Sequence, residues 1–264
     1  MRIRRSFLSK LAITVASLAA LEFHATADSL KINQVSGYYD TSFNGGEFNI
    51  SNVTGAASAA VGYYDSKATA NGGFETFCLE MNQYISVPGN YNYGVSSAAI
   101  SGGVSTGATG YTSGGVSHDP ISIGTAWLYL QFASGTLAGY TYAPGTARGT
   151  SAEQLQTAIW WLENELTLTT TQQNANPFLH LITLSVAQGG LGISDSTARA
   201  TDNGSTYAVG VINMGNAPNY GSQDQLVLTA ARTPHAVPDG GATVLLLGSV
   251  FGGLSFLKRK FSKA

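Results

Sequence analysis

Cys78 and Gln156 are the residues of this chain whose types and settings could support covalent chemistry. Cys78 is the only cysteine among 264 residues. It can form no disulfide within the chain, so it is a buried small hydrophobic residue, a free thiol or a partner in another covalent bond. Gln156 lies in the run Leu155 to Trp160 and shares a helix face with Trp160, four residues further on. A glutamine beside a tryptophan is an unusual choice for a merely solvated face.

These two sequence patterns together resemble the thioester domains of bacterial surface adhesins. That family carries an aromatic-Cys motif on a strand and a Gln-x-Ala-x-Trp motif on a helix, in this order. The resemblance implies that the Cys78 thiol and the Gln156 carbonyl join with loss of ammonia, and that Phe77, Ala158 and Trp160 shield the bond. A lysine amine of a partner would then attack the carbonyl, leaving the chain attached through Gln156.

The resemblance has departures, and an ordinary interpretation stands beside it. The adhesin family prefers threonine before the glutamine, where this chain has Leu155. Those adhesins are mostly from Gram-positive bacteria. Cys78 could equally be a buried residue of a strand, and Leu155 to Leu166 an amphipathic helix with a tryptophan in the core.

Other chemistry has little support in the sequence, and we predict no metal site, no cofactor and no catalytic residue. The histidines are scattered without ligand spacing. Two carboxylate pairs, Glu75 with Glu80 and Glu163 with Glu165, keep a carbohydrate-active enzyme open as an alternative. The second pair is poor, because helix residues two apart do not share a face.

The pattern of apolar and turn residues predicts a mainly β fold with a helical insertion (α+β), a sandwich or barrel, over residues 28–230. The insertion is expected at about residues 118–190. Its helices should begin at Asp119-Pro120, at a capping box from Ser151 to Gln154, and at Asn176-Pro177. The Gly- and Ser-rich segment 94–117 is expected to be a disordered loop or a weak edge strand.

The N-terminus has the three parts of a secretory signal peptide, expected over residues 1–27. Basic residues precede an apolar run from Leu11 to Leu21, and Ala25-Thr26-Ala27 is a small-residue cleavage site. The mature chain would begin at Asp28 after export by the Sec machinery.

The C-terminus resembles the VPDSG variant of the PEP-CTERM sorting signal, expected over residues 237–264 after a linker at 231–236. Its motif is Val237-Pro238-Asp239-Gly240-Gly241, with Gly240 where that variant usually has serine. An apolar segment, 242–257, is near the lower limit of roughly 17–25 residues for a membrane helix. The basic stop Lys258-Arg259-Lys260 would stay cytoplasmic. The resemblance implies a Gram-negative envelope and processing by an exosortase after transient anchoring in the inner membrane.

The net charge of the body argues against two classes of partner. Eight of the 13 Lys and Arg residues lie in the two targeting segments, which leaves the body 5 basic and 13 acidic residues, a net charge near −8. Such a body is a poor ligand for nucleic acid or anionic membranes. We therefore predict a structural or adhesive protein of the cell surface or extracellular matrix, in contact with polysaccharide or surface amines. The first alternative is a covalent adhesin with a Cys78–Gln156 thioester.

Overall fold

Two antiparallel sheets carry the strands, in a computed structural model that describes residues 28–40, 45–100, 103, 110–217 and 220–229. The larger sheet has the order β10-β9-β5-β1-β2-β4-β3 and the smaller one the order β6-β8-β7. The strands are β1 (Ser29–Asn33), β2 (Phe48–Thr54), β3 (Thr69–Ala70), β4 (Gly73–Thr76), β5 (Gly89–Ser96), β6 (Ala98–Ile100), β7 (Tyr111–Ser113), β8 (Val116–Pro120), β9 (Val209–Met214) and β10 (Gln225–Leu228). The predicted mainly β fold with helices is confirmed.

The larger sheet does not close into a barrel, so that part of the fold prediction is wrong. Its pairing order has two ends, β10 and β3. The chain after β4 meets β10 at a single bridge between Cys78 and Gln225. A barrel needs continuous pairing between its first and last strands, and here the contact extends over only a few residues, 76–79 against 224–226.

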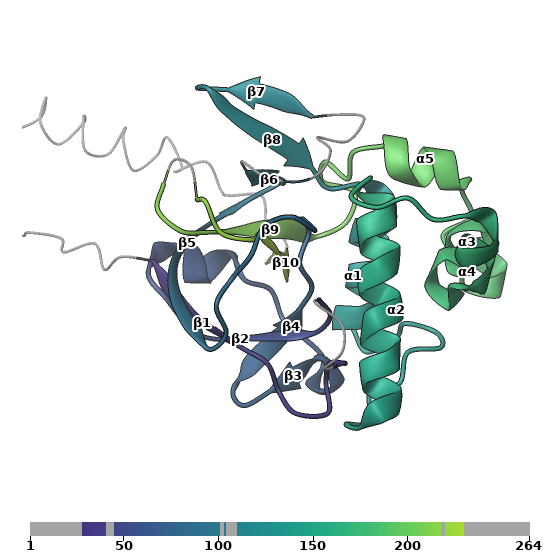
Figure 1. Cartoon of the computed structure of the whole chain (residues 1–264), viewed down its shortest axis with the longest axis horizontal. Coiled ribbons are helices and arrows are strands. Elements are labelled where there is room, and N and C mark those ends of the chain that lie inside the picture. Colours follow the sequence, from purple (N-terminus) through teal and green to yellow (C-terminus); the bar gives the residue numbers. More distant parts are fainter. Residues whose placement is uncertain (1–27, 41–44, 101–102, 104–109, 218–219, 230–264) are drawn as a thin grey trace, which may run out of the picture.

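Helices occupy the chain between β8 and β9 and stand beside the larger sheet (Figure 1). Helix α1 packs on β9 and β10, and α2 packs on α1 and α4. The helices are α1 (Ile123–Ala133), α2 (Thr146–Leu162), α3 (Thr170–Ala175), α4 (Pro177–Thr183) and α5 (Asp195–Ala200). Short 3-10 turns are η1 (Ala56–Ala60), η2 (Ser66–Ala68) and η3 (Val186–Gln188). Much of the core is thus sheet against helix.

The helix starts agree with the sequence in one case of three. Asn176 caps α4, with its side chain accepting hydrogen bonds from the N–H groups of Phe178 and Leu179, as Asn-Pro predicts. Helix α1 instead begins after Ser122, because Asp119 and Pro120 belong to β8. Helix α2 begins after Gly145, so Ser151 lies inside the helix rather than at its cap.

Several predicted segments fall outside the described residues, namely the signal peptide, the linker beyond residue 229, the sorting tail and its apolar segment 242–257. Within the described part of the chain, no helix is long and apolar enough to cross a membrane. The Gly- and Ser-rich stretch contributes the end of β5 together with β6, β7 and the start of β8. Its residues 101–102 and 104–109 are not described.

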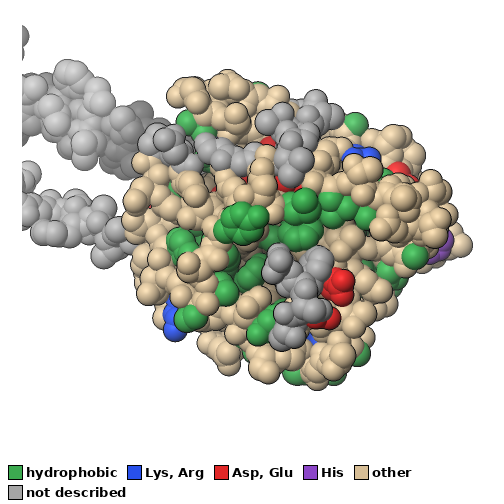
Figure 2. Space-filling model, in the orientation of Figure 1, with side chains coloured by type: hydrophobic (Ala, Val, Ile, Leu, Met, Phe, Trp, Pro, Cys, Tyr) green, Lys and Arg blue, Asp and Glu red, His purple; other side chains and the backbone are tan. Residues whose placement is uncertain are grey.

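Charged side chains are few and scattered on the face that Figure 2 shows. Six acidic residues are instead buried: Glu47, Glu75, Glu80, Glu163, Glu165 and Asp224. The formal charge of the body therefore overstates what a partner would meet at the surface.

Replacing Asn176 with alanine should destabilise the protein by about 1–2 kcal/mol. Besides capping α4, the Asn176 amide donates a hydrogen bond to the carbonyl of Gln154 in α2, at 2.8 Å, so the substitution removes both a cap and a link between helices. Thermal unfolding would measure the loss. The matched control is Asn174→Ala, an exposed position in α3, which should leave the melting temperature nearly unchanged. Equal effects of the two substitutions would contradict the role of the cap.

Candidate functional site

The structure brings Cys78 and Gln156, 78 residues apart in sequence, into direct contact. The Cys78 sulfur lies 3.2 Å from the Gln156 side-chain oxygen, Oε1. The same oxygen accepts hydrogen bonds from two backbone N–H groups, those of Cys78 at 3.1 Å and Gly46 at 3.3 Å. The Gln156 carbonyl is therefore held beside a thiol and polarised by two main-chain donors.

The rest of the Gln156 amide is equally fixed. Its nitrogen, Nε2, donates to the Cys78 carbonyl at 2.8 Å, so both ends of the amide are bonded to the Cys78 backbone. Both residues are 0% exposed, and a buried amide is costly unless its donors and acceptors are satisfied. These bonds offset that cost and leave the side chain little freedom to rotate.

Burial controls the chemistry of the thiol. It raises the pKa of Cys78 well above its usual value, and the nearby Glu80 raises it further. The Trp160 side chain acts in the opposite direction and lowers this pKa. The thiol is thus protonated at neutral pH, and the Trp160 indole is placed to stabilise negative charge on the sulfur when such charge develops.

Strand β10 fixes the position of Cys78 on the sheet side. Cys78 forms an antiparallel bridge with Gln225. On either side, Leu226 N–H donates to the Phe77 carbonyl at 3.0 Å and Leu79 N–H donates to the Asp224 carbonyl at 3.1 Å. The short contact between residues 76–79 and β10, which does not close the sheet into a barrel, therefore holds the Cys78 thiol in place.

One stripe of α2 carries the helical side of the site. Arg148, Ala152, Gln156 and Trp160 follow each other at intervals of four residues, which places them along one side of the helix. A Cβ atom on Gly46 would lie 3.9 Å from that of Ala152, so the segment before β2 rests directly on this stripe. We call these four residues the α2 stripe.

Gly46 has a backbone conformation that favours glycine, with φ at +103°. The space around it would admit a methyl group at ordinary contact distance from Tyr39 and Ala152. The requirement for glycine is thus conformational rather than steric. It sets the direction in which the Gly46 N–H points.

The residue after Gly46 forms a buried ion pair with the first turn of α2. Arg148 and Glu47 are 1% and 0% exposed. Arg148 Nε donates to Glu47 Oε2 at 2.9 Å, its second nitrogen contacts Oε1, and the Tyr140 hydroxyl adds a bond to Oε2 at 2.8 Å. The guanidinium also stacks on Tyr38 with 3.6 Å to the ring centre. Burial lowers the pKa of Arg148, but its bonds to Glu47 outweigh this and raise the pKa, so the side chain stays charged.

The other two residues predicted to shield the bond, Phe77 and Ala158, are both buried. Phe77 is fully buried and packs edge-on against Phe132 of α1, with ring centres 5.0 Å apart. Ala158 is also buried, but it lies two residues from Gln156 and therefore about 200° around the helix. The small residue on the same stripe as Gln156 is Ala152.

Three contributors to the site were not foreseen from the sequence: Gly46, the Arg148–Glu47 pair and Ala152. The spacing of Arg148, Ala152, Gln156 and Trp160 was a readable signal. An arginine is rarely buried unless paired, so its position on the stripe of a core helix pointed to a partner. Nothing near Gly46 in sequence indicated that its N–H would reach Gln156, because that contact spans 110 residues.

The arrangement is suited to acyl transfer between the two side chains. Attack of the Cys78 sulfur on the Gln156 carbonyl carbon would form an S–C bond and break the C–N bond. The amide nitrogen would leave as ammonia with the thiol proton. In the tetrahedral intermediate the negative charge falls on Oε1, where the N–H groups of Cys78 and Gly46 already point. Such a pair of donors is the arrangement that stabilises oxyanions in acyl transfer.

Buried carboxyl groups flank this site. Asp224 N–H donates to Glu80 Oε2 at 3.0 Å, while Asp224 Oδ2 accepts from Ile100 N–H at 2.6 Å and from Asn213 at 2.9 Å. Among the described residues no donor reaches Glu80 Oε1 or Asp224 Oδ1. Burial and then the neighbouring Asp224 raise the pKa of Glu80, and burial raises that of Asp224 to about 7. A retained proton would supply the missing donor between the two groups.

The carboxyl groups of the two pairs noted in the sequence are all buried. No group of His, Cys, Asp and Glu among the described residues could hold a metal ion. Glu75 bonds to Asn49, Glu163 to Ser122 and Glu165 to the Met81 N–H. The carboxylates that kept a carbohydrate-active enzyme open are thus buried and bonded to structural partners.

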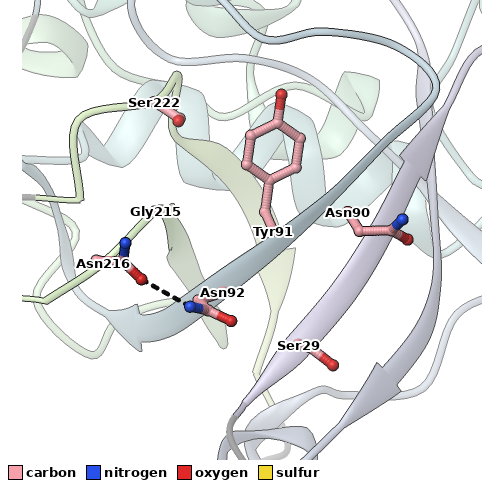
Figure 3. Close-up of a pocket in the computed structure, with 7 residues that line it drawn as sticks. All are labelled: Ser29, Asn90, Tyr91, Asn92, Gly215, Asn216 and Ser222. Atoms are coloured by element: carbon pink, nitrogen blue, oxygen red, sulfur yellow. Dashed lines mark hydrogen bonds between the residues drawn. The ribbon is translucent and has the colours of Figure 1, made fainter.

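A surface pocket of about 390 Å³ lies apart from these residues (Figure 3). Its lining is uncharged and comes from β1, β5 and the segment between β9 and β10. Asn92 and Asn216 are bonded to each other there at 2.6 Å. With no titratable carboxylate, histidine or cysteine in its lining, we assign it no chemistry.

The body is thus a mainly β domain with a buried Cys–Gln pair, in which β10 holds Cys78 and helix α2 carries Gln156. Comparison with curated proteins and with solved structures gives no match to this chain. Residues 236–261 match the VPDSG-CTERM motif, a sorting tail of the PEP-CTERM type, which confirms the predicted tail. This motif indicates an exported, cell-surface protein that is processed by an exosortase.

Protein stability should fall as pH rises from about 4 to about 8. A carboxyl whose folded-state pKa is raised binds its proton more tightly when folded. Its contribution is therefore full below the unfolded pKa, near 3.9, and is lost as pH rises through the folded pKa. For Asp224 that pKa is about 7, and for Asp119 it is about 8, both raised mainly by burial. For the fully buried Asp224 alone, the loss should be on the order of 4 kcal/mol.

Asp224→Asn should flatten this dependence and raise the melting temperature at pH 8. An amide at this position cannot ionise and can donate to Glu80 Oε1. Melting temperatures from pH 4 to pH 9 provide the measurement. Glu153→Gln, at a partly exposed position of α2, is the control and should follow the wild-type curve. Parallel curves for Asp224→Asn and the wild type would refute the assignment.

Proposed function

We propose that this protein is a covalent adhesin of the cell surface that acts through an internal Cys78–Gln156 thioester. The observation that carries the proposal is the contact of the Cys78 sulfur with a carboxamide whose oxygen is held by two backbone donors. A buried cysteine of ordinary structural role needs no such partner, and an ordinary glutamine of a helix face has no reason to be 0% exposed.

The enclosure supports the same function. A thioester in water hydrolyses, so a lasting one needs a site from which water is excluded. Cys78 and Gln156 are buried, and the Trp160 side chain is 95% buried next to the sulfur. Attack by a primary amine would form an amide at Gln156 and return the proton and both sulfur electrons to Cys78 as a free thiol. The chain would then be joined to its target.

The sorting tail gives this chemistry its setting. An exported protein released or retained at the cell surface can meet amines of neighbouring polypeptides. We infer export by the Sec machinery with removal of residues 1–27. We also infer transient anchoring in the inner membrane through residues 242–257 before exosortase processing. A non-covalent structural or adhesive role, in contact with polysaccharide, is the second candidate and needs neither Cys78 nor Gln156.

Incubation of the purified protein with methylamine tests the thioester. We expect the intact mass to increase by one methylamine molecule, with the modification on Gln156, and one thiol to become reactive towards iodoacetamide only after that reaction. The comparison is made within one preparation, so it does not depend on how the chain ends are processed.

Cys78→Ala and Gln156→Glu should abolish the addition, since each lacks one half of the bond. Gln154→Glu, two residues away on the same helix, should still take up methylamine. If the wild type shows no mass change and its thiol can be alkylated after unfolding without amine, the covalent function is wrong and the non-covalent one remains.

Trp160→Ala should shorten the lifetime of the thioester in buffer, because it opens the enclosure around the sulfur. Trp160→Phe keeps the apolar cover and loses the indole N–H, so it should hydrolyse at a rate closer to the wild type. The rate of appearance of free thiol at neutral pH measures both. Identical lifetimes in Trp160→Ala and the wild type would show that the side chain does not protect the bond.

A further inference from the structure

We propose that the buried Arg148–Glu47 ion pair is a positioning device that aims the Gly46 N–H at the reacting carbonyl. This inference rests on the proposed thioester function. Among the described residues, no hydrogen bond or ion pair joins Arg148 or Glu47 to Cys78 or Gln156. Their influence would act through the chain segment that carries Gly46.

Gly46 lacks the support that the other donor has. The Cys78 N–H belongs to residues bonded to β10 on both sides. Gly46 lies before β2, which begins at Phe48. The pairing of β2 with its neighbours therefore does not hold the Gly46 N–H in place. A donor in this position needs another anchor if it is to stay directed at Oε1.

The anchor is the next residue. Glu47 receives two nitrogens of Arg148 and the hydroxyl of Tyr140, which satisfies the carboxylate from several directions. A bidentate Arg–carboxylate pair fixes orientation as well as distance. Because Glu47 is covalently joined to Gly46, holding its carboxylate restricts rotation of the peptide groups on which the Gly46 N–H depends.

Arg148, which holds the donor segment through Glu47, and Gln156, which carries the carbonyl, lie on one rigid element, helix α2. Arg148 and Gln156 are two turns apart on the α2 stripe, with Ala152 against Gly46 between them. The helix therefore holds the acyl-bearing residue and, through Arg148, the donor that serves it. A shift of the helix would carry both together, so their relative geometry would be preserved.

The guanidinium is itself fixed by groups outside the site. It bonds to the carbonyls of Tyr142 and Lys67, the latter at 3.1 Å, and stacks on Tyr38. Lysine at this position would keep the charge but could not reproduce the fork. The contacts of Arg148 thus fix the orientation of the ion pair as well as neutralising the charge of Glu47.

The test measures reaction rate and carbonyl polarisation in folded protein. The full chain is prepared as the wild type, Arg148→Lys, Glu47→Gln and the apolar double variant Glu47→Leu/Arg148→Met. Methylamine is the probe, and its second-order rate constant is followed by mass. The stretching frequency of the thioester carbonyl is read by infrared spectroscopy with ¹³C-labelled glutamine. Melting temperature reports stability separately.

We expect the apolar double variant to react about 10–100-fold more slowly than the wild type. Complete loss of one oxyanion donor slows acyl transfer by about 100-fold or more, so a misdirected Gly46 N–H should give a loss up to that size. Its carbonyl stretch should move to higher frequency, because a lost hydrogen bond leaves the C=O bond less polarised. Arg148→Lys and Glu47→Gln should give smaller changes in the same direction. If the double variant does not fold, these two conservative variants provide the test.

Arg199→Met is the matched control. Like Arg148, Arg199 stacks on an aromatic ring, that of Trp161 in α2, and it donates a hydrogen bond to Asn164. It has no ion pair with the residue next to Gly46. It should change stability without changing rate or frequency. Lower melting temperatures with unchanged rates and frequencies in all Arg148 and Glu47 variants would overturn the positioning role while leaving the thioester intact. A wild type that takes up no methylamine would overturn both proposals.

Discussion

The hydrogen bonding of one buried carboxamide connects the parts of this fold. Gln156 is fully enclosed, and its oxygen and nitrogen are satisfied by the backbone of Cys78 and by Gly46. An amide buried without these bonds would destabilise the protein by several kcal/mol. Helix α2, the segment before β2 and the segment after β4 must therefore meet at one point. The contact of β10 with residues 76–79 and the Arg148–Glu47 pair hold two of those segments in place.

This constraint explains why polar groups are concentrated where a core would ordinarily be apolar. The site lies among buried carboxyl groups, an ion pair and a polarised carbonyl, all bonded to specific partners. Such networks tolerate little displacement, because removing one member leaves another unsatisfied. The same rigidity suits acyl transfer, which needs donors already directed at the developing charge before reaction begins. Stability and chemistry thus depend on the same contacts.

Local sequence patterns predicted the kinds of secondary structure better than the helix starts and the contacts between strands. The alternating and helical periodicities gave the mainly β fold with helices between strands, and Asn176-Pro177 gave the start of α4. The starts of α1 and α2 were wrong because Pro120 was taken into a strand and because Gly145, rather than a polar cap, precedes Thr146. The barrel was wrong because closure depends on pairing between residues about 150 apart, which no local pattern encodes.

The same limit applies to the site. Cys78 and Gln156 could be paired from the sequence only through a resemblance to a family motif, and the structure places the two side chains in contact. Gly46 and Glu47 could not be placed, since their partners on α2 are about 100 residues away. The spacing of Arg148 with Gln156 and Trp160 was visible, but a stripe of residues does not identify what it faces.

The central claim is that the Gln156 carbonyl is bonded to the Cys78 sulfur in the mature protein. The most direct measurement is the ¹³C NMR spectrum of protein labelled at the glutamine side-chain carbonyl. The account predicts one resonance in the thioester region that is absent in Cys78→Ala and moves to the amide region when methylamine is added. A spectrum with every labelled carbonyl in the amide region, in freshly prepared and folded wild-type protein, would contradict it.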